Sequence, residues 1–277
     1  MNKVNGVSNF DGSKILQEAF MKANHKALIT FVTAGDPSPE DTIDYVLEME
    51  RGGADIVELG IPFSDPTAEG PVIQQSSHRA LSAGMTVEKT FDMIRTLRER
   101  SDIPLVIMTY ANVVFSYGYE RFFESCRRQQ IAGLILVDIP FEEKDEVDEV
   151  ASQYGVALIS LIAPTSGERI AGIARNAKGF LYVVSDMGVT GMRQEIATDL
   201  SRMITQIRAV TTTPCAIGFG ISTPQQAARM REFADGCIVG SAIVSKIGED
   251  PQRAQKELAD FVYLLKNGTC QAQNDVL

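Results

Sequence analysis

Residues 27–60, ALITFVTAGDPSPEDTIDYVLEMERGGADIVELG, contain two short apolar runs separated by a longer amphipathic stretch. The first run, ALITFVT, and the last, DIVELG, are rich in β-branched and other apolar residues, which is typical of strands buried on both faces. Between them, apolar residues recur at helical spacing from Ile43 to Met49 and stop at Gly52, as expected of a helix that begins after Pro39. The stretch therefore predicts a strand–helix–strand unit with parallel strands.

The same alternation continues along the chain. The candidate strands are eight apolar runs, at 27–33, 55–60, 104–110, 133–138, 156–162, 180–185, 214–219 and 235–240. Helical patterns lie at 86–100, 119–130, 143–154, 193–210, 223–233 and 251–266, and one more near 13–24 precedes the first strand. Eight such units in roughly 250 residues predict an α/β fold, a closed (β/α)8 TIM barrel. No linker interrupts the pattern, so we expect a single domain over residues 1–277, with an ordered core of about 10–266.

Composition and charge exclude several classes of protein. The 277 residues are 44% hydrophobic, which is too apolar for a disordered chain. The formal net charge of −10 argues against a nucleic-acid or anionic-membrane surface. No apolar run approaches the ~20 residues needed to span a bilayer. The N-terminal residues lack the apolar stretch of a signal peptide, so we expect a cytoplasmic protein.

The cysteines and histidines do not form a recognisable metal pattern. Four widely spaced cysteines suggest neither a disulfide framework nor a zinc site, and we expect the first three in or near the core. His25 and His78 are the only histidines, and both are most simply surface residues. No lysine lies in the eight runs, which argues against a Schiff-base aldolase. The sequence thus predicts a site with no metal and no cofactor of its own.

Glu58 is a carboxylate inside the second apolar run, among Ile56, Val57 and Leu59. Burying a carboxylate there is costly unless the group is used or hydrogen-bonded. Burial would also raise its pKa and suit it to acid/base chemistry near neutral pH. In barrels of this kind the reactive groups lie at the carboxyl ends of the strands. We therefore regard Glu58 as a candidate catalytic residue, the alternative being a structural carboxylate held by hydrogen bonds.

The loop after this run, GIPFSDPTAEGP at 60–71, is long for a strand–helix connection and carries Asp65 and Glu69 between three prolines. Proline fixes φ and stiffens the loop. A rigid acidic loop at the barrel mouth could hold a second catalytic carboxylate, or it could be a docking surface for a partner. The spacing alone does not decide between these interpretations.

Glycines follow three late strands. Gly188-Val-Thr-Gly191 comes after the sixth strand, Gly218-Phe-Gly220 ends the seventh, and Gly240-Ser241 ends the eighth. Glycine lets backbone N–H groups approach an anion closely, and a short helix after Gly240 would direct its N-terminus at a phosphate. The three loops together predict a phosphate site.

At these residues the sequence resembles the tryptophan synthase alpha chain family. The strongest match is VELGIPFSDPTAEGPVIQ at 57–74. Further matches are FVTAGDP (31–37), TYAN (109–112), VDIP (137–140), GVTG (188–191), GFGIS (218–222) and GSAIV (240–244). The resemblance implies cleavage of indole-3-glycerol phosphate to indole and glyceraldehyde 3-phosphate. It also implies an αββα complex in which indole passes to a beta chain that carries pyridoxal phosphate.

The resemblance further implies a role for each matching residue. Glu58 would be the general acid/base, and Glu69 the second catalytic carboxylate. Phosphate would be held by Gly191, Gly220, Gly240 and Ser241. The substrate pocket would contain Phe31, Thr190, Tyr182 and Phe219, and the loop residues Pro62, Asp65 and Pro66 would face or communicate with the beta chain.

Two segments depart from the family's pattern. Relatives usually carry Asp in Leu-Ala-Asp-Gly-Pro, where this chain has Thr67-Ala-Glu69-Gly-Pro. Either Glu69 serves in a repacked loop, with the smaller Thr67 making room for its longer stem, or the chain is weakly active and mainly activates its beta chain. In the segment after the sixth strand, which the resemblance implies is a mobile lid, Asp186 and Met187 stand where many relatives have a basic or small residue.

Overall fold

The computed structural model describes residues 10–185, 194–218 and 220–267. Within these residues it contains nine strands. They are β1 (Ala27–Thr33), β2 (Ile56–Gly60), β3 (Leu105–Thr109), β4 (Ile131–Leu136), β5 (Ala157–Leu158), β6 (Ser160–Ile162), β7 (Leu181–Val184), β8 (Cys215–Gly218) and β9 (Gly236–Val239). All ladders are parallel, in the order β5-β4-β3-β2-β1-β9-β8-β7-β6.

The two ends of this order are one residue apart in the chain, so the sheet curls into a nearly closed barrel. The predicted strand at 156–162 is divided at Ile159: Leu158 pairs with Leu134 on β4, whereas Ser160 pairs with Leu181 on β7. The prediction of one continuous strand there was wrong, because the chain changes its hydrogen-bonding partner at Ile159. The predicted barrel architecture is confirmed.

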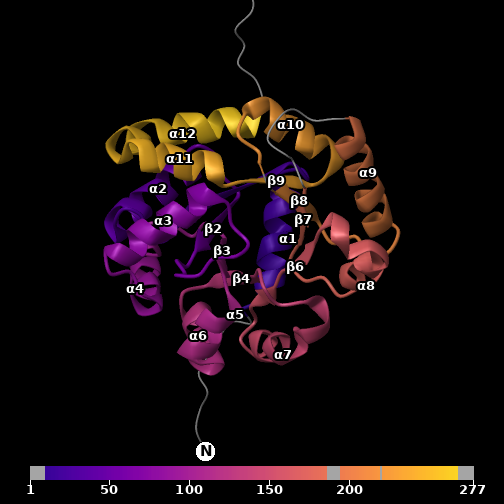
Figure 1. The fold of residues 1–277 in the computed structure, drawn as a ribbon, viewed down its shortest axis with the longest axis horizontal. Helices are drawn as coiled ribbons and strands as arrows, with labels where there is room; N and C mark the ends of the chain where they lie inside the picture. The colour runs from indigo at the N-terminus through magenta and orange to yellow at the C-terminus, as the bar shows by residue number, and fades with distance from the viewer. Residues whose placement is uncertain (1–9, 186–193, 219, 268–277) are drawn as a thin grey trace, which may run out of the picture.

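Helices surround the barrel, except the first, which lies across its centre in the view of Figure 1. They are α1 (Gly12–Lys22), α2 (Pro39–Arg51), α3 (Pro71–Ser82), α4 (Val87–Leu97), α5 (Ala111–Tyr117), α6 (Tyr119–Arg128), α7 (Asp145–Gln153), α8 (Ile170–Arg175), α9 (Gln194–Arg208), α10 (Pro224–Phe233), α11 (Ser241–Glu249) and α12 (Pro251–Asn267). Two 3-10 segments, η1 (Phe141–Glu143) and η2 (Pro164–Arg169), complete the described elements. The helix at 241–249 is the short helix predicted after the eighth strand, whereas α3, α5 and α8 lie outside the predicted helical ranges.

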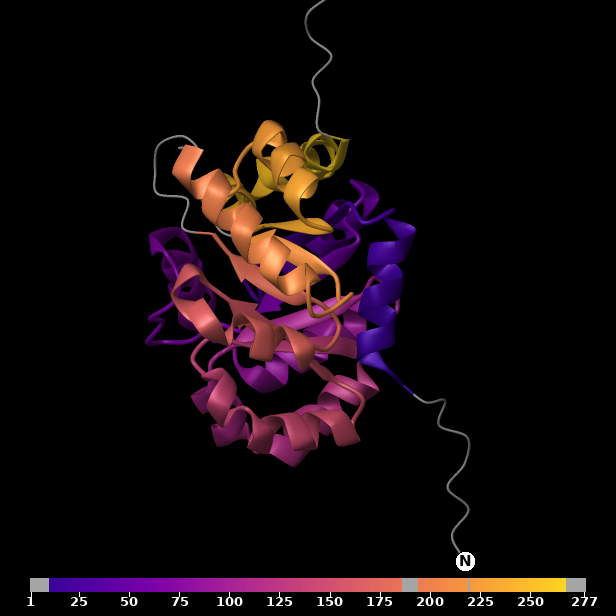
Figure 2. The ribbon, with the colours of Figure 1, turned by 90° about the vertical axis from the view of Figure 1, so that its right-hand side faces the viewer.

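Alternate residues of each strand face opposite sides of the barrel wall. On β1, Ile29 belongs to an inner cluster, and Leu28 belongs to the outer layer between strands and helices. The extra N-terminal helix closes one end of the inner cluster, because Leu16 and Phe20 of α1 are fully buried in it. Phe20 packs against Phe180 with ring centroids 5.6 Å apart. Figure 2 shows α1 at the right-hand edge of the molecule, across one end of the barrel. This end is thereby sealed, which leaves the opposite end for chemistry.

The described part of the chain has no helix that is both long and apolar enough to cross a membrane. Cys126, Cys215 and Cys237 are free and buried, as expected from the sequence. His25 is exposed beside Asp235, and His78 is also exposed.

Candidate active site

The carboxyl ends of the strands bring together side chains that face the barrel interior. On β1, Phe31 is in register with Glu58 on the neighbouring β2. Both are buried, with exposed fractions of 6% and 1%. Ile29 and Ile56, two residues earlier on the same strands, are also in register and fill the barrel core. Side chains two residues apart on a strand point to the same side, so Phe31 and Glu58 also point inward, one layer closer to the mouth.

Glu58 is a buried carboxyl group with an oxygen, Oε2, that has no hydrogen-bond partner among the described residues. Burial raises its pKa to about 8. The group is therefore mostly protonated at pH 7 and can donate a proton. Because its pKa lies close to the working pH, the ionised form can accept a proton in turn. Burial, and then the charge of Glu58, raise the pKa of Tyr182 well above its usual value, which keeps the phenol protonated.

Two glycines at strand ends make room for the aromatic rings of the mouth. A Cβ on Gly60 would lie 2.6 Å from Cζ of Phe31, and one on Gly218 would lie 2.5 Å from the hydroxyl oxygen of Tyr182. Any side chain at these positions would displace a ring. The result is an aromatic-lined mouth next to Glu58.

Glu69 is half-buried in the loop between β2 and α3, and Tyr110 at the end of β3 holds it. The Tyr110 hydroxyl donates to Oε2 of Glu69. It also accepts from the backbone N–H groups of Thr67 at 2.9 Å and Ala68 at 3.0 Å. The ring of Phe63 stacks on Tyr110 with centroids 4.8 Å apart. One side chain thus fixes both the loop and its carboxylate.

Opposing effects act on the pKa of Glu69. Burial raises it, the hydrogen bonds from Tyr110 and the backbone lower it, and the charge of Asp138 raises it; the net direction is upward. Tyr110 itself was not singled out from the sequence, although it stood in the matching TYAN motif at the end of a predicted strand.

The far end of this loop is anchored by α3. Arg79 of α3 makes two hydrogen bonds to Asp36, at 2.8 and 2.7 Å, and Asp36 is almost completely buried after β1. The hydroxyls of Thr33 and Ser76 lie 2.5 Å apart in the same region. The loop that carries Glu69 is therefore held at both ends, which favours a fixed position for the carboxylate.

The candidate phosphate residues lie at the end of β9 and in the loop after β8. Gly240 is the N-cap of α11, which has no side-chain cap, and Ser241 is exposed at the first helical position. Gly220 is also exposed. The first N–H groups of a helix have no partner within the helix and favour an anion. The predicted residues Thr190, Gly191 and Phe219, together with the lid residues Asp186 and Met187, lie outside the described residues.

The three loop residues assigned to a partner surface differ in exposure. Pro62 is buried, Pro66 is half-buried, and Asp65 is exposed and accepts a hydrogen bond of 2.5 Å from Ser64 Oγ. Only the latter two could contact a partner directly; Pro62 could act through the shape of the loop.

A parallel barrel with a buried carboxyl group and an aromatic-lined mouth at the carboxyl ends of its strands has the architecture of a (β/α)8-barrel enzyme. Comparison with known proteins identifies the family. Residues 17–273 match the family model described as tryptophan synthase alpha chain. The chain therefore belongs to the tryptophan synthase alpha chain family.

Individual relatives agree. The tryptophan synthase alpha chain of Caldanaerobacter subterraneus is 49% identical over 247 residues, which cover 88% of this chain and 94% of the relative. That of Lactiplantibacillus plantarum is 50% identical, covering 86% and 90%. Among solved structures, a chain in the tryptophan synthase α2β2 complex of Pyrococcus furiosus superposes with a TM-score of 0.80 at 34% identity, covering 87% and 98%.

The alpha chains of this family catalyse the lyase reaction on indole-3-glycerol phosphate. They have no cofactor, and pyridoxal phosphate is carried by the beta chain. Among the described residues of this chain, no three His, Cys, Asp or Glu side chains are grouped so that they could hold a metal ion.

Proposed function

We propose that this chain cleaves indole-3-glycerol phosphate to indole and glyceraldehyde 3-phosphate, and that Glu58 is the acid/base. The observation that carries the proposal is the buried Glu58 carboxyl group, with a pKa of about 8 and a free oxygen beside Phe31. A retro-aldol cleavage needs one group that gives a proton to a carbon and takes one from a hydroxyl, and a carboxyl group that titrates near the working pH can do both.

The reaction then follows from the two carboxyl groups. Protonated Glu58 gives its proton to C3 of the indole ring, which leaves positive charge on the ring. Glu69 accepts a hydrogen bond from the indole N–H and stabilises this charge. Glu58, now ionised, takes the proton of the side-chain hydroxyl while the carbon–carbon bond breaks. The bonding electrons return to the ring, so indole and an aldehyde leave and Glu58 is protonated again.

Phosphate binding is proposed at the N-terminus of α11. Gly240, Ser241 and Gly220 are the described residues of this site, and Gly191 is assigned to it from the family resemblance alone. Phe31, Tyr182, Phe219 and Thr190 complete the proposed pocket. Because α11 has no side-chain cap, its first N–H groups remain available to a substrate.

Replacing Ser241 by Asp should test this site. The added carboxylate would occupy the anion position and repel the phosphate, so we expect KM for indole-3-glycerol phosphate to rise about 10- to 100-fold with an unchanged melting temperature. Steady-state indole release measures KM, and Ser245→Asp, one turn further along α11, is the control. An unchanged KM in Ser241→Asp would place the phosphate elsewhere.

We also propose that the chain assembles with a beta chain through the loops at its mouth. The Pyrococcus furiosus neighbour is part of an α2β2 complex. In this chain the exposed Asp65, the half-buried Pro66 and the side chain of Phe115 on α5, which is 67% exposed, offer a surface after β2 and β3. An exposed aromatic residue beside polar ones is typical of protein interfaces.

The chain would act in the cytoplasm, where its buried thiols stay reduced.

Indole release from indole-3-glycerol phosphate tests the function, with this chain alone and with a beta chain from a close relative. Slow release that rises strongly with the beta chain supports both the lyase activity and the coupling. The second candidate function, an allosteric activator with little chemistry of its own, rests on Glu69 in place of the usual Asp. It would be favoured by stimulation of the beta chain without any indole release.

A further inference from the structure

A small cavity lies where β5 gives way to β6, and its residues are not those assigned to the reaction. Its volume is about 50 Å³. The lining includes Leu136 of β4, Phe141 of η1, Ser160 and Leu161 of β6, and Ile173 of α8, together with Lys144 at the start of α7. A single water molecule needs about 10–15 Å³. The cavity therefore has room for a few water molecules or for a small organic ion.

Lys144 brings a positive charge into this apolar lining. The residue is only 8% exposed, and its Nζ lies 4.6 Å from the centre of the Phe141 ring. Among the described residues, no carboxylate or carbonyl oxygen accepts a hydrogen bond from Nζ. Burial lowers the pKa of Lys144, as expected for a desolvated ammonium group. An ammonium group on an apolar lining is stabilised by an anion that accepts its hydrogen bonds.

The neighbouring acids make no hydrogen bond to Lys144 Nζ. Asp148, one turn along α7, raises the pKa of Lys144 as the largest of the charge effects on it, but the hydrogen bond of 2.7 Å that it accepts comes from Lys178. Asp145 is exposed on the first turn of α7 and also raises the pKa of Lys144, as the last of the four influences on it. The charge of Lys178 acts in the opposite direction and lowers that pKa.

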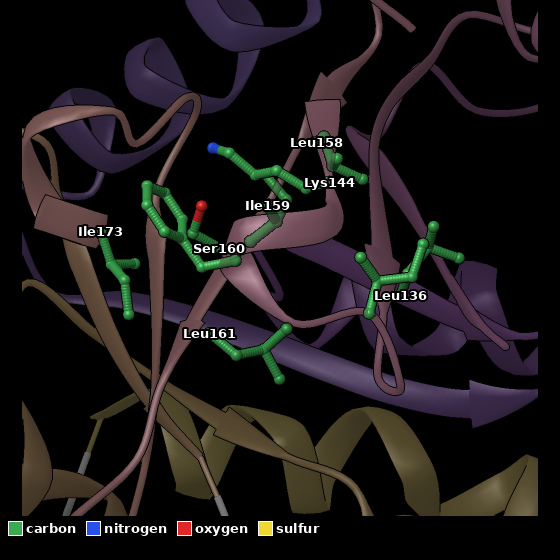
Figure 3. A pocket seen from close by; sticks show the side chains of 9 residues that line it. Leu136, Lys144, Leu158, Ile159, Ser160, Leu161 and Ile173 are labelled. Carbon is green, nitrogen blue, oxygen red and sulfur yellow. The ribbon is translucent and has the colours of Figure 1, made fainter. Parts of the chain in front are cut away.

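A second polar group faces the same space. Ser160 is 8% exposed, and its hydroxyl makes no hydrogen bond to any described residue. In Figure 3 the Ser160 oxygen points toward the side on which the Lys144 nitrogen lies, while Leu136, Leu161 and Ile173 surround the rest of the cavity. The site thus combines one ammonium group, one hydroxyl donor and an apolar wall.

We propose that this cavity binds a small carboxylate, with its charged end on Lys144 and Ser160 and its carbon atoms against the apolar wall. A carboxylate fits better than a phosphate because the described lining offers one positive charge and mostly apolar side chains. Binding favours the ammonium form of Lys144, since an opposite charge nearby raises the pKa of an amine.

Equilibrium dialysis with radiolabelled acetate at pH 7 and constant ionic strength tests the proposal. We expect one saturable site with a Kd in the millimolar range, and a melting temperature that rises with acetate but not with acetamide. Lys144→Met should weaken binding about tenfold or more, because a charged hydrogen bond is lost. Lys256→Met, which removes an exposed charge on α12 away from the cavity, should bind acetate normally.

Ser160→Val provides a second test that keeps the amine, since the larger side chain occupies the cavity and should also weaken binding. If circular dichroism shows that Lys144→Met does not fold, acetate binding by Ser160→Val alone tests the proposal. The proposal is overturned by the absence of saturable acetate binding, by binding that survives in Ser160→Val and Lys144→Met, or by inorganic phosphate binding to the same site more tightly than acetate.

Discussion

Glu58→Gln is expected to reduce indole release from indole-3-glycerol phosphate by about 10³-fold, within the range that general acid–base catalysis contributes. Glutamine keeps the shape of the side chain but can neither give nor take the proton. The loss should appear in kcat, with KM changed little, because Gly240 and Ser241 are untouched. Steady-state measurement of indole release gives kcat and KM, and single-turnover measurement gives the rate constant of the chemical step. Release within tenfold of the unmodified chain would remove Glu58 from the mechanism.

The stability of the same variant provides the folding control and tests the pKa of Glu58. The native pKa is about 8, whereas an exposed glutamate in the unfolded chain titrates near ~4.3. Between these values the native state binds one proton more than the unfolded state. The protonation of Glu58 therefore contributes fully to the free energy of unfolding below about pH 4. This contribution is lost as the pH rises toward 8, by up to ~1.4 kcal/mol per pH unit.

Glu58→Gln lacks this titration. Its free energy of unfolding, measured in urea, should therefore increase relative to that of the unmodified chain between pH 5 and pH 8. Parallel stability curves for the two proteins would show that Glu58 titrates normally in the native state, and the acid role proposed for it would lose its physical basis.

Much of the fold could be predicted because buried parallel strands and amphipathic helices have different periods. The runs that became β1 and β2, and the helix α2 between them, follow from pattern alone. The division at Ile159 does not, because a change of ladder partner leaves no mark in a run as apolar as VALISLI. The helices α5 and α8 have seven and six residues, too few for a 3.6-residue period to be recognised.

The site divides in the same way. Glu58 could be singled out because a charged residue inside an apolar run conflicts with its surroundings. Tyr110 could not be singled out, because tyrosine is common in strands. Its role depends on Glu69, which lies 41 residues earlier in the chain. Lys144 is a further case: a lysine before an acidic helix resembles a surface residue until the packing of Phe141 and β6 buries it.

The contact between Tyr110 and Glu69 bears on whether the longer carboxylate is a defect or an adaptation. Because Tyr110 binds both Glu69 and the backbone of its loop, a shorter side chain would leave the hydroxyl without its carboxylate partner. We therefore expect Glu69→Asp to lower kcat by about 10- to 100-fold, since a displacement of ~1 Å can cost that much. A rate that rises in Glu69→Asp would instead favour the weakly active activator.

Tyr110→Phe separates positioning from packing, because it keeps the ring against Phe63 and removes only the hydroxyl. The hydrogen bond from Tyr110 lowers the pKa of Glu69, so its loss should shift the acidic limb of the kcat/KM profile to higher pH. In the double variant, Glu69→Asp should cost little beyond Tyr110→Phe, since the two act as a unit. Tyr117→Phe, which removes a 2.8 Å hydrogen bond to Glu88, is the matched control and should leave the profile in place. If the two substitutions lower kcat/KM additively and the pH profile of kcat/KM does not shift, Tyr110 only packs against Phe63. The backbone of the loop would then position Glu69.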